Sequence, residues 1–264
     1  MNKPGEEPLL SLPERHSRIL SLLQQNGSIS VTQLSELFKV SEVTIRKDLS
    51  YLEQQKKLYR THGSAILISP YISDRHVKEK EKKNVAEKRA IGAAAAALVS
   101  QDDSIIIASG TTMAFLAREI KPVGRLTVIT AAVPVTQILS QHADVDVIQL
   151  GGITRSSSVS VVGPFAEAML RNFNCSKLFV GVDGIDTEFG LTTTNVLEAS
   201  LNDAMINAAQ KVVVLADSSK FGRRGFSKIC DLEAVDRIIT DSGVQPLYLE
   251  RLRERGIEVT VVDV

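Results

Sequence analysis

Short runs of Val and Ile alternate with longer stretches of mixed character through the last two thirds of the chain. The apolar runs lie at 104–108, 126–130, 145–150, 177–182, 211–216, 237–241 and 258–262. Most of the segments between them are long enough for a helix or a crossover connection. This alternation predicts an α/β domain with a mainly parallel sheet. An alanine tract at 92–97 predicts a helix just before the first strand, since alanine is the best helix former.

The first 55 residues follow a period of three to four instead, which predicts three short helices. The first covers 14–25 and ends at Asn26 and Gly27. Ser30 caps the second, which ends in a tight turn at 39–40. Ser41 caps the third, and its apolar positions share one face: Ile45, Leu49 and Leu52.

The opposite face of the third helix carries polar and basic residues and is free to meet a ligand. Its members are Val43, Thr44, Lys47, Ser50 and Tyr51, with Arg46 on the flank. Two helices joined by a short turn, the second with such a face, have the geometry that enters a DNA major groove. We expect Val43 and Thr44 to contact base edges, and Arg46 or Lys47 to pair with guanine or phosphate.

Two strand-like segments, 58–61 and 65–68, follow the third helix and predict a hairpin wing. Arg60 and His62 are placed there to reach the DNA backbone. The whole chain has 31 basic and 31 acidic residues, so any basic surface must be local. Between residues 39 and 65, six basic residues stand against three acidic ones. From periodicity and charge alone, a plain three-helix bundle with a solvated basic face remains the alternative.

The run 30–65 resembles the winged helix-turn-helix of the DeoR family of bacterial transcriptional regulators. The residues that carry the resemblance are Val-Ser-Glu-Val-Thr-Ile-Arg-Lys-Asp-Leu at 40–49 and His-Gly-Ser-Ala at 62–65. Ser64 departs from the family, which more often has a second glycine there. The resemblance implies a DNA-binding domain at 13–70, with the helix-turn-helix at about 31–50 and double-stranded operator DNA as partner. The residues expected at the DNA are Ser41, Val43, Thr44, Arg46, Lys47, Arg60 and His62.

A second candidate site follows the first strand of the α/β region, where Ser109, Gly110, Thr111 and Thr112 open a helix. The glycine allows close backbone approach, and the free amides and the hydroxyls suit a phosphate. No Gly-Lys-Ser/Thr element and no Gly-x-Gly-x-x-Gly run is present, so a nucleoside triphosphate or dinucleotide is not indicated. A purely structural helix cap is the alternative.

Polar groups also follow three later strands. They are Gly151 and Gly152 with Arg155 nearby, the run from Asp183 to Asp186, and the run from Asp217 to Lys220. Each on its own is equally explained as a turn or a surface residue. In open α/β sheets, however, ligands bind at the carboxyl ends of strands, where all four groups fall.

The segment 109–225 resembles the effector domain of the same family, whose fold is similar to ribose-5-phosphate isomerase, so the resemblance spans 14–263. It implies a repressor of a carbohydrate-utilisation operon, controlled by a phosphorylated sugar. By this resemblance, Ser109, Gly110, Thr111 and Thr112 hold the phosphate. Around the sugar it places Gly151, Gly152, Arg155, Asp183, Glu198 and Lys220.

Ala108 and the pair Ala131 and Ala132 stand where many family members have an aspartate and an asparagine. If these positions line the pocket, the ligand is deoxygenated, differently oriented or bulkier than the common effectors. Residues 71–90, with mixed charges at 74–89, are predicted to form a solvated linker helix. The effector domain then occupies 91–264.

The rival interpretation is an isomerase-like enzyme with a DNA-binding appendage. Enediol chemistry needs a carboxylate base and an electrophile. The stretch 189–197 has no lysine, whereas the isomerases carry a Lys-Gly-Gly-Gly-type loop there. We therefore expect binding without turnover and no catalytic residues. A pure interaction scaffold would leave the strand-end groups without a purpose.

Several other classes are not indicated. The N-terminus lacks the basic start and apolar stretch of a secretory signal, and the longest apolar runs fall short of the ~20 residues of a membrane helix. Two cysteines without Cys-x-x-Cys spacing and four scattered histidines indicate no metal site. We expect a cytoplasmic protein without cofactor or membrane partner. Helix-turn-helix proteins usually bind with two-fold symmetry, so a homodimer or homotetramer is expected.

Overall fold

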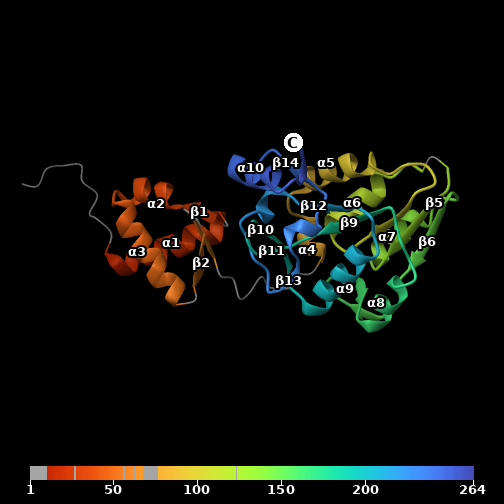
Figure 1. Cartoon of the computed structure of the whole chain (residues 1–264), viewed down its shortest axis with the longest axis horizontal. Helices are drawn as coiled ribbons and strands as arrows, with labels where there is room; N and C mark the ends of the chain where they lie inside the picture. The colour runs from red at the N-terminus through yellow and green to blue at the C-terminus, as the bar shows by residue number, and fades with distance from the viewer. Residues whose placement is uncertain (1–10, 27, 56, 62–63, 68–76, 123) are drawn as a thin grey trace, which may run out of the picture. The chain divides into compact units, whose positions relative to one another are not determined.

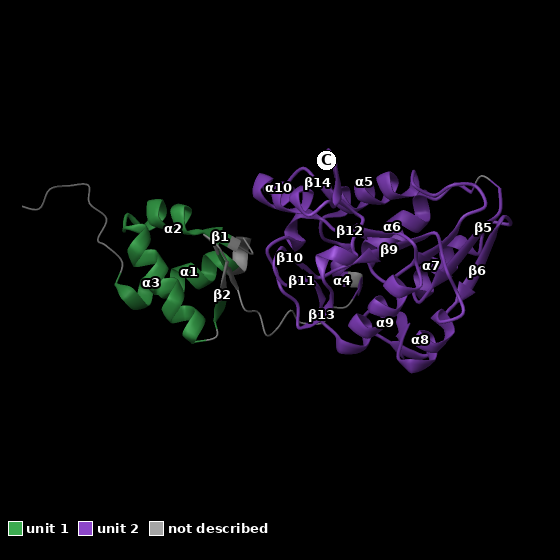
Figure 2. Ribbon diagram, in the orientation of Figure 1, with its two compact units in different colours: residues 1–70 green, residues 71–264 purple. Residues whose placement is uncertain are grey.

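The computed structural model of the 264-residue chain describes residues 11–264 except 27, 56, 62–63, 68–76 and 123. The chain divides into two compact units, Met1–Pro70 and Tyr71–Val264 (Figure 2). Unit 1 has one hydrophobic cluster, and unit 2 has two.

Unit 1 combines three helices with a small antiparallel sheet. The helices are α1 (Leu12–Asn26), α2 (Val31–Phe38) and α3 (Glu42–Gln54), and the strands are β1 (Ser28–Ser30), β2 (Leu58–Thr61) and β3 (Ser64–Leu67). The sheet order is β1-β3-β2. The three helices and the hairpin were predicted from the sequence, whereas β1 was not, because three residues are too few to show a period.

Local chemistry fixes both ends of the helix-turn-helix. Ser30 and Gln33 form a reciprocal capping box at the start of α2. Lys39 ends α2 in the left-handed conformation, with φ 54°, and Ser41 accepts a hydrogen bond from the Thr44 amide at the start of α3. Ile45, Leu49 and Leu52 are buried as the spacing predicted, so α3 turns its polar face outward.

Unit 2 is built on a seven-stranded sheet in which every pair of neighbours is parallel. Its strands are β4 (Ser104–Ile107), β5 (Leu126–Thr130), β6 (Val145–Gln149), β9 (Lys177–Gly181), β12 (Val212–Leu215), β14 (Arg237–Asp241) and β15 (Glu258–Val262). All seven predicted strands are confirmed, each within one residue at either end.

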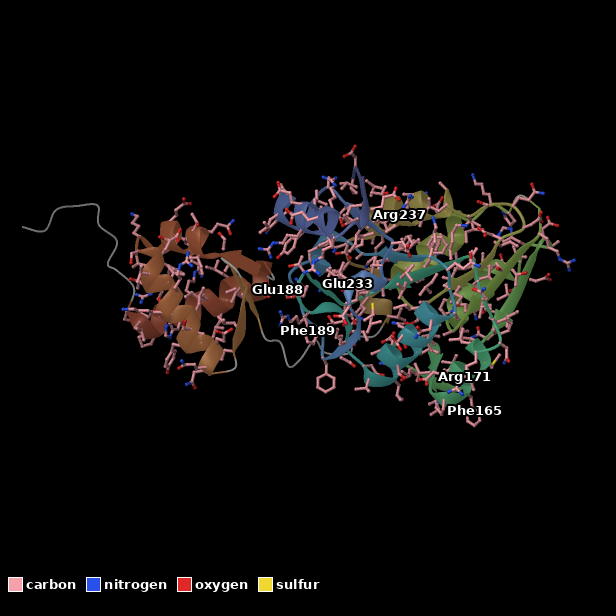
Figure 3. The ribbon with its side chains drawn as sticks, viewed as in Figure 1. Phe165, Arg171, Glu188, Phe189, Glu233 and Arg237 are labelled. Atoms are coloured by element: carbon pink, nitrogen blue, oxygen red, sulfur yellow. The ribbon has the colours of Figure 1, made fainter. Side chains whose placement is uncertain are left out.

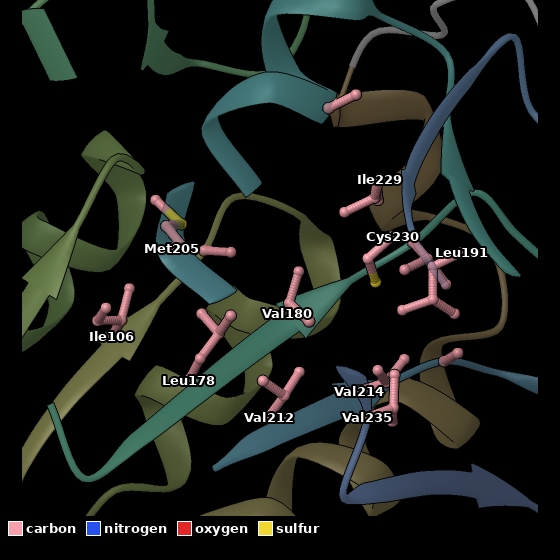
Figure 4. Packing of buried hydrophobic residues seen from close by; sticks show 14 of the residues in the cluster. Ile106, Leu178, Val180, Leu191, Met205, Val212, Val214, Ile229, Cys230 and Val235 are labelled. Atoms are coloured by element: carbon pink, nitrogen blue, oxygen red, sulfur yellow. The ribbon is translucent and has the colours of Figure 1, made fainter. Parts of the chain in front are cut away.

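Helices cover both faces of this sheet (Figure 1). They are α5 (Val85–Ala96), α6 (Thr111–Glu119) and α7 (Val133–Leu139) on one face, and α8 (Pro164–Leu170), α9 (Val196–Asn207) and α10 (Pro246–Glu254) on the other. Alternate residues of a strand serve opposite clusters: Ile105 and Ile107 pack with α6, and Ile106 belongs to the cluster around Leu178 and Val180 (Figure 4). Figure 3 shows Phe165 of α8 at the molecular surface.

The order of the strands creates a topological switch point in the sheet, where the direction of winding reverses. The order is β15-β14-β12-β9-β4-β5-β6, so the chain first winds outward from β4 through β5 and β6. It then returns to β9, on the other side of β4, and winds in the opposite direction. A crevice forms at the carboxyl ends of the two strands that flank such a switch point, which here are β4 and β9.

Short antiparallel elements complete unit 2. Strands β10 (Gly184–Asp186), β11 (Gly190–Thr193) and β13 (Ser227–Cys230) form a second sheet, and β7 (Ile153–Arg155) pairs with β8 (Ser160–Val162). Single turns of 3-10 helix occur at Ser218–Lys220 and Leu232–Ala234. The sequence pattern predicted none of these, because they are short and, unlike the strands of the main sheet, most do not stand out as runs of Val and Ile.

The described part of 71–90 departs from the single linker helix that was expected, although most of its residues are exposed. Two helices occur instead, α4 (Val77–Glu81) and α5, separated at Asn84 with a left-handed φ of 51°. Helix α5 continues through the alanine tract and buries Lys88, Ile91 and Ala95. It packs closely on α6, because a Cβ at Gly92 would lie 2.8 Å from the Leu116 amide nitrogen. Among the residues of 77–90 whose burial is described, Lys88 alone is buried, and the contribution of α5 to the core begins at Ile91.

Among the described helices, none combines the length and the apolar character needed to cross a bilayer.

Candidate functional site

The outer face of α3 is a shallow hollow lined by Val43, Arg46, Lys47, Ser50, Tyr51 and Gln54. Val43 is 63% exposed there, although it is apolar. The face predicted from helical spacing is thus open to solvent. An exposed apolar residue between two cations suits contact with base methyl groups and phosphates.

Three of the residues expected at the DNA also have structural partners. Ser41 Oγ lies 2.9 Å from Thr44 Oγ1 as well as capping the helix. Arg46 Nη2 donates to Glu42 Oε2 at 3.0 Å, and Glu42 also accepts from Thr32 Oγ1. The hydrogen bond from Arg46 is the main cause that holds the pKa of Glu42 below its ordinary value. A ligand that pairs with Arg46 would therefore compete with Glu42.

One of the acidic residues of α3, Asp48, is buried, so its charge does not lie on the exposed face of the helix. It accepts from Arg15 Nε at 2.5 Å and Nη2 at 3.1 Å, and lies 3.2 Å from His16 Nε2. The His16 ring stacks on Tyr51, with centroids 5.1 Å apart. Arg60 lies in β2, and the prediction for His62 lies outside the described residues.

The second candidate site is a cavity at the carboxyl ends of β4, β9 and β12. Its lining comprises Lys80, Lys88, Ser109, Gly110, Thr111, Thr112, Met113, Gly181, Val182, Asp183, Thr193, Glu198, Leu215, Ala216, Asp217 and Lys220. Seven of the ten residues expected at an effector are among them: Ser109, Gly110, Thr111, Thr112, Asp183, Glu198 and Lys220. The switch point of the sheet has brought together residues more than a hundred positions apart.

The start of α6 supplies hydrogen-bond donors to this cavity. Gly110 precedes the helix with φ 134°, and no side chain caps it. Thr111 and Thr112 are each 8% exposed, and within the described residues no protein group hydrogen-bonds to either hydroxyl. Free amides and hydroxyls at a helix N-terminus favour an anion.

Asp183 is the best-connected carboxylate of the cavity. Lys80 Nζ donates to its Oδ1 at 2.9 Å, and Lys220 Nζ lies 3.9 Å from the same atom. Thr193 and Thr194 donate to Oδ2 at 3.2 and 3.3 Å. Burial is the largest single influence and would raise the pKa of Asp183, but the charges of Lys80 and Lys220 and the hydrogen bonds from Lys80 and Thr193 together hold the pKa below its usual value. Asp183 is thus an anion that neutralises the lysines around it.

Glu198 links the cavity to a buried arginine. It accepts from Ser109 Oγ and from Arg155 Nη1, both at 2.9 Å. The side chains of Arg155 and Glu198 are only 10% and 15% exposed. Arg155 is not among the lining residues of the cavity, but it holds Glu198, which is.

Other residues that the sequence singled out do not line the cavity. Gly151 and Gly152 are exposed and are not among its lining residues. Asp186 is buried in an ion pair with Arg224, 2.8 Å from Nε. The three alanines that depart from the family, Ala108, Ala131 and Ala132, belong to the hydrophobic clusters. Because none of these alanines lines the cavity, the premise for an unusual ligand is not met.

Sequence reasoning missed three polar lining residues: Lys80, Lys88 and Thr193. Lys88 is 5% exposed, and its ammonium donates to the carbonyls of Lys80 and Lys83. Burial lowers its pKa. A pattern could have revealed Lys88, because Lys88, Ile91 and Ala95 share one helical face. Nothing in the sequence distinguishes Lys80 from the lysines beside it.

Two family models match the chain. The DeoR-like helix-turn-helix domain matches residues 15–71, and the DeoR C terminal sensor domain matches residues 83–242. The second match covers more than half of the chain and includes most of the cavity.

Curated relatives match over nearly the whole length. A Bacillus subtilis protein described as an uncharacterized HTH-type transcriptional regulator, YulB, is 39% identical over 94% of this chain and 96% of its own. A putative aga operon transcriptional repressor of Escherichia coli O157:H7 is 38% identical over 98% of this chain and 97% of its own. The lactose phosphotransferase system repressor of Lactococcus lactis is 33% identical over 91% and 95%.

Among solved structures, the full-length sorbitol operon regulator SorC from Klebsiella pneumoniae matches with a TM-score of 0.38 and 11% identity. That match covers 94% of this chain and 95% of SorC. Ribose 5-phosphate isomerase A from Methanocaldococcus jannaschii has a TM-score of 0.39 and 17% identity, over 53% and 55% of the two chains.

Proposed function

The chain belongs to the DeoR family of transcriptional regulators, and we propose that it represses a carbohydrate-utilisation operon until a phosphorylated sugar occupies the cavity of unit 2. The relatives are regulators and repressors, and this chain is likewise a regulator and not an enzyme. Binding of the sugar then changes affinity for DNA without turnover.

Operator recognition is assigned to α3. The exposed residues Val43, Arg46 and Lys47 supply base and phosphate contacts, while Ser41 and Thr44 orient the start of the helix. Arg60 and His62 on the wing are assigned to the DNA backbone. Burial of Asp48 supports this assignment, because it removes one acidic group from a surface that must approach phosphates.

The observation that carries the effector assignment is the start of α6. Two threonines that are each 8% exposed, whose hydroxyls have no hydrogen-bond partner among the described residues, and an uncapped helix N-terminus line a cavity that also holds Lys220. Phosphate satisfies such donors directly. We assign Ser109, Gly110, Thr111, Thr112 and Lys220 to the phosphate. Asp183 and Glu198 are assigned to sugar hydroxyls, with Arg155 orienting Glu198.

Assembly and location follow from the proposed role. A helix-turn-helix protein that reads a palindromic operator needs two copies, so we propose a homodimer or homotetramer. Phe165, 74% exposed on α8, is an apolar surface residue available for self-association. Because a repressor works on the chromosome, we place the protein in the cytoplasm.

The test is fluorescence anisotropy with labelled DNA from the region upstream of the chain's own gene. Protein is added at fixed salt, since affinity for DNA depends on ionic strength. The complex is then challenged with a panel of aldose and ketose phosphates and their unphosphorylated counterparts. We expect one phosphorylated compound to release the DNA, with no product detected by chromatography. Tight DNA binding that no compound alters would contradict effector control, and conversion of a sugar phosphate would restore the enzyme interpretation.

A further inference from the structure

Helix α8 carries an exposed face. Ala166 and Leu170 of this helix are buried in one of the hydrophobic clusters of unit 2, whereas Phe165, Ala168 and Arg171 are exposed (Figure 3). Phe165 is 74% exposed, the highest value among the large apolar side chains that the structure describes. A single exposed apolar residue is ordinary, so the surroundings of Phe165 decide whether it belongs to an interface.

Further exposed apolar residues lie on the elements that pack against α8. Ile153 of β7 is 58% exposed and Val196 at the start of α9 is 55% exposed. A Cβ at Gly163, the residue before α8, would lie 3.7 Å from Ile153 Cδ1. On the other side, Ser200 of α9 donates to Glu167 of α8 at 2.8 Å. Three neighbouring elements therefore contribute exposed apolar side chains to the same part of the surface, as at an interaction site.

The order of the exposed residues on α8 suits pairing of this helix with a copy of itself. Phe165 and Arg171 lie three residues before and three residues after Ala168, and Arg171 keeps the helical φ and ψ of −60° and −18°. Three residues turn the helix by about 300°, so Phe165 and Arg171 lie about 60° to either side of Ala168. A two-fold axis at Ala168 would place each Phe165 against Arg171 of the second copy.

The two side chains complement each other in charge as well as in position. Within the part of the chain that the structure describes, the Arg171 guanidinium has no carboxylate or aromatic ring as a partner. A guanidinium over a phenylalanine ring is a favourable cation–π contact. The small side chain of Ala168 lets two helices approach closely at the axis. One copy of the chain thus offers both halves of a contact that only a second copy, turned by the two-fold axis, brings together.

A second exposed aromatic surface, around Phe189 and Phe226, does not have this property. Its cations already have partners within the chain, because the Arg224 guanidinium lies 4.9 Å and the Lys228 ammonium 5.2 Å from the centre of the Phe189 ring. The exposed guanidinium of α8, in contrast, is left for a ring of another molecule.

We propose that the exposed face of α8 is a contact between two copies of this chain, related by a two-fold axis at Ala168 and held by two Phe165–Arg171 pairs. Such a contact has the same residues on both sides, and aromatic and arginine side chains are enriched at protein interfaces. The inference rests on the proposed homo-oligomer and adds to it the surface and the residues that form it.

The first test is the mass of the full-length protein, measured by sedimentation equilibrium over a range of concentrations. Phe165→Lys sets two like charges against each other across the axis and should weaken self-association by roughly tenfold or more. Adding Arg171→Glu to that variant makes the charges opposite again and should restore association. Because residues 165 and 171 lie about 120° apart around one helix, the rescue needs a second copy. Leu247→Lys, at an exposed apolar position of α10, is the matched control and should associate as the parent does.

A disulfide tests the position of the axis independently. Both native cysteines are buried, so a cysteine introduced at the surface is the one that mild oxidation reaches. Ala168→Cys places two thiols at the axis, and a disulfide forms where Cα atoms approach to about 4.4–6.8 Å. We expect a covalent dimer from Ala168→Cys. Ala143→Cys, at another exposed alanine, should give far less.

The outcomes separate this inference from the proposed function. If the parent protein is a monomer at every concentration, the proposed homo-oligomer fails, and this inference fails with it. If the parent is oligomeric but Phe165→Lys associates as tightly as Leu247→Lys, or Ala168→Cys cross-links no faster than Ala143→Cys, the homo-oligomer stands and α8 is not its contact. Failure of Arg171→Glu to restore association would refute the pairing of Phe165 with Arg171.

Discussion

Arg15 on α1 donates two hydrogen bonds to Asp48 on α3, from Nε at 2.5 Å and from Nη2 at 3.1 Å. Both side chains are at least 90% buried. The hydrogen bond to Asp48 is the main cause that raises the pKa of Arg15. This ion pair fixes α3 to α1 through a buried residue of α3.

Replacing Asp48→Asn should therefore destabilise unit 1 by about 3–5 kcal/mol, because it leaves a buried guanidinium without its anion. The measurement is the urea midpoint of unit 1, followed by hydrogen exchange of α3 peptides in the full chain. Glu42→Gln is the control, since the Glu42–Arg46 ion pair is exposed and an exposed pair adds little stability. Equal midpoints for the two variants would contradict a structural role for the buried pair.

Arg46 and Lys47 should affect DNA binding in different ways. If Arg46 pairs with a base, Arg46→Ala should cost roughly 1–3 kcal/mol and relax discrimination at one position of the operator. If Lys47 contacts phosphate, Lys47→Ala should weaken binding to all sequences and reduce the salt slope by about 1. Anisotropy against single-base operator variants at several salt concentrations distinguishes them. Lys121→Ala, exposed in unit 2, should change neither, and a uniform loss for Arg46→Ala would make it a phosphate contact.

Filling the start of α6 with a fixed negative charge should block the response to effector. Thr111→Glu places a carboxylate where the phosphate is proposed to bind, so the variant should hold operator DNA with ordinary affinity and ignore the sugar phosphate that releases the parent protein. The anisotropy titration measures both. Gln141→Glu adds the same charge at an exposed position and should respond normally. Release from Thr111→Glu at the parental concentration would exclude this helix from the site.

Asp183 should make unit 2 more stable at neutral than at acidic pH. Its pKa is lowered in the folded protein, so its contribution is complete above the unfolded value of about 3.9 and disappears as the pH falls through the folded value. The difference in unfolding free energy between the parent and Asp183→Asn should be largest near pH 7 and shrink below pH 4. Urea unfolding at several pH values tests the trend, with exposed Asp144→Asn as control. A difference that grows on acidification would reverse the assigned sign.

The two cysteines should be inert in the folded chain. Burial, followed by the nearby carboxylates Asp203 and Asp231, raises the pKa of Cys230 to about 12, and burial also raises the pKa of Cys175. At pH 8 the thiolate population of Cys230 is about a thousandfold below that of a free cysteine. A thiol reagent should therefore label neither residue until urea unfolds unit 2. Rapid labelling of the native protein would show that the sheet opens locally.

The sequence was most informative where a pattern repeats. The seven sheet strands could be predicted to within one residue because each is an apolar run between polar segments, and α3 because three buried residues recur on one face. Strand β1 and the strands of the second sheet could not, since they are short and include Gly, Ser, Thr, Asp or Lys where the predicted strands have runs of Val and Ile.

The cavity could be predicted in part, for a related reason. Ser109 to Thr112 follow a strand directly, and chain order alone puts them at its carboxyl end. Lys80 and Lys88 reach the same place only because α5 packs on α6 and α4 folds back from it. The sequence alone does not distinguish a lysine whose alkyl chain is buried from one that is fully solvated. Gly151 and Gly152 show the converse, because they too follow a strand, β6, but that strand lies at the far edge of the sheet.

The lining residues of the cavity lie as far apart in the sequence as Lys80 and Lys220. During synthesis, the residues of unit 1 are therefore complete before those of the cavity. A ribosome adds about 5–20 residues per second, and Lys220 follows Pro70 by 150 positions. Each new chain therefore carries all residues of its DNA-binding unit for roughly 8–30 seconds before the last lysine of the cavity exists. A newly made chain thus has its DNA-binding unit before its proposed effector site is complete.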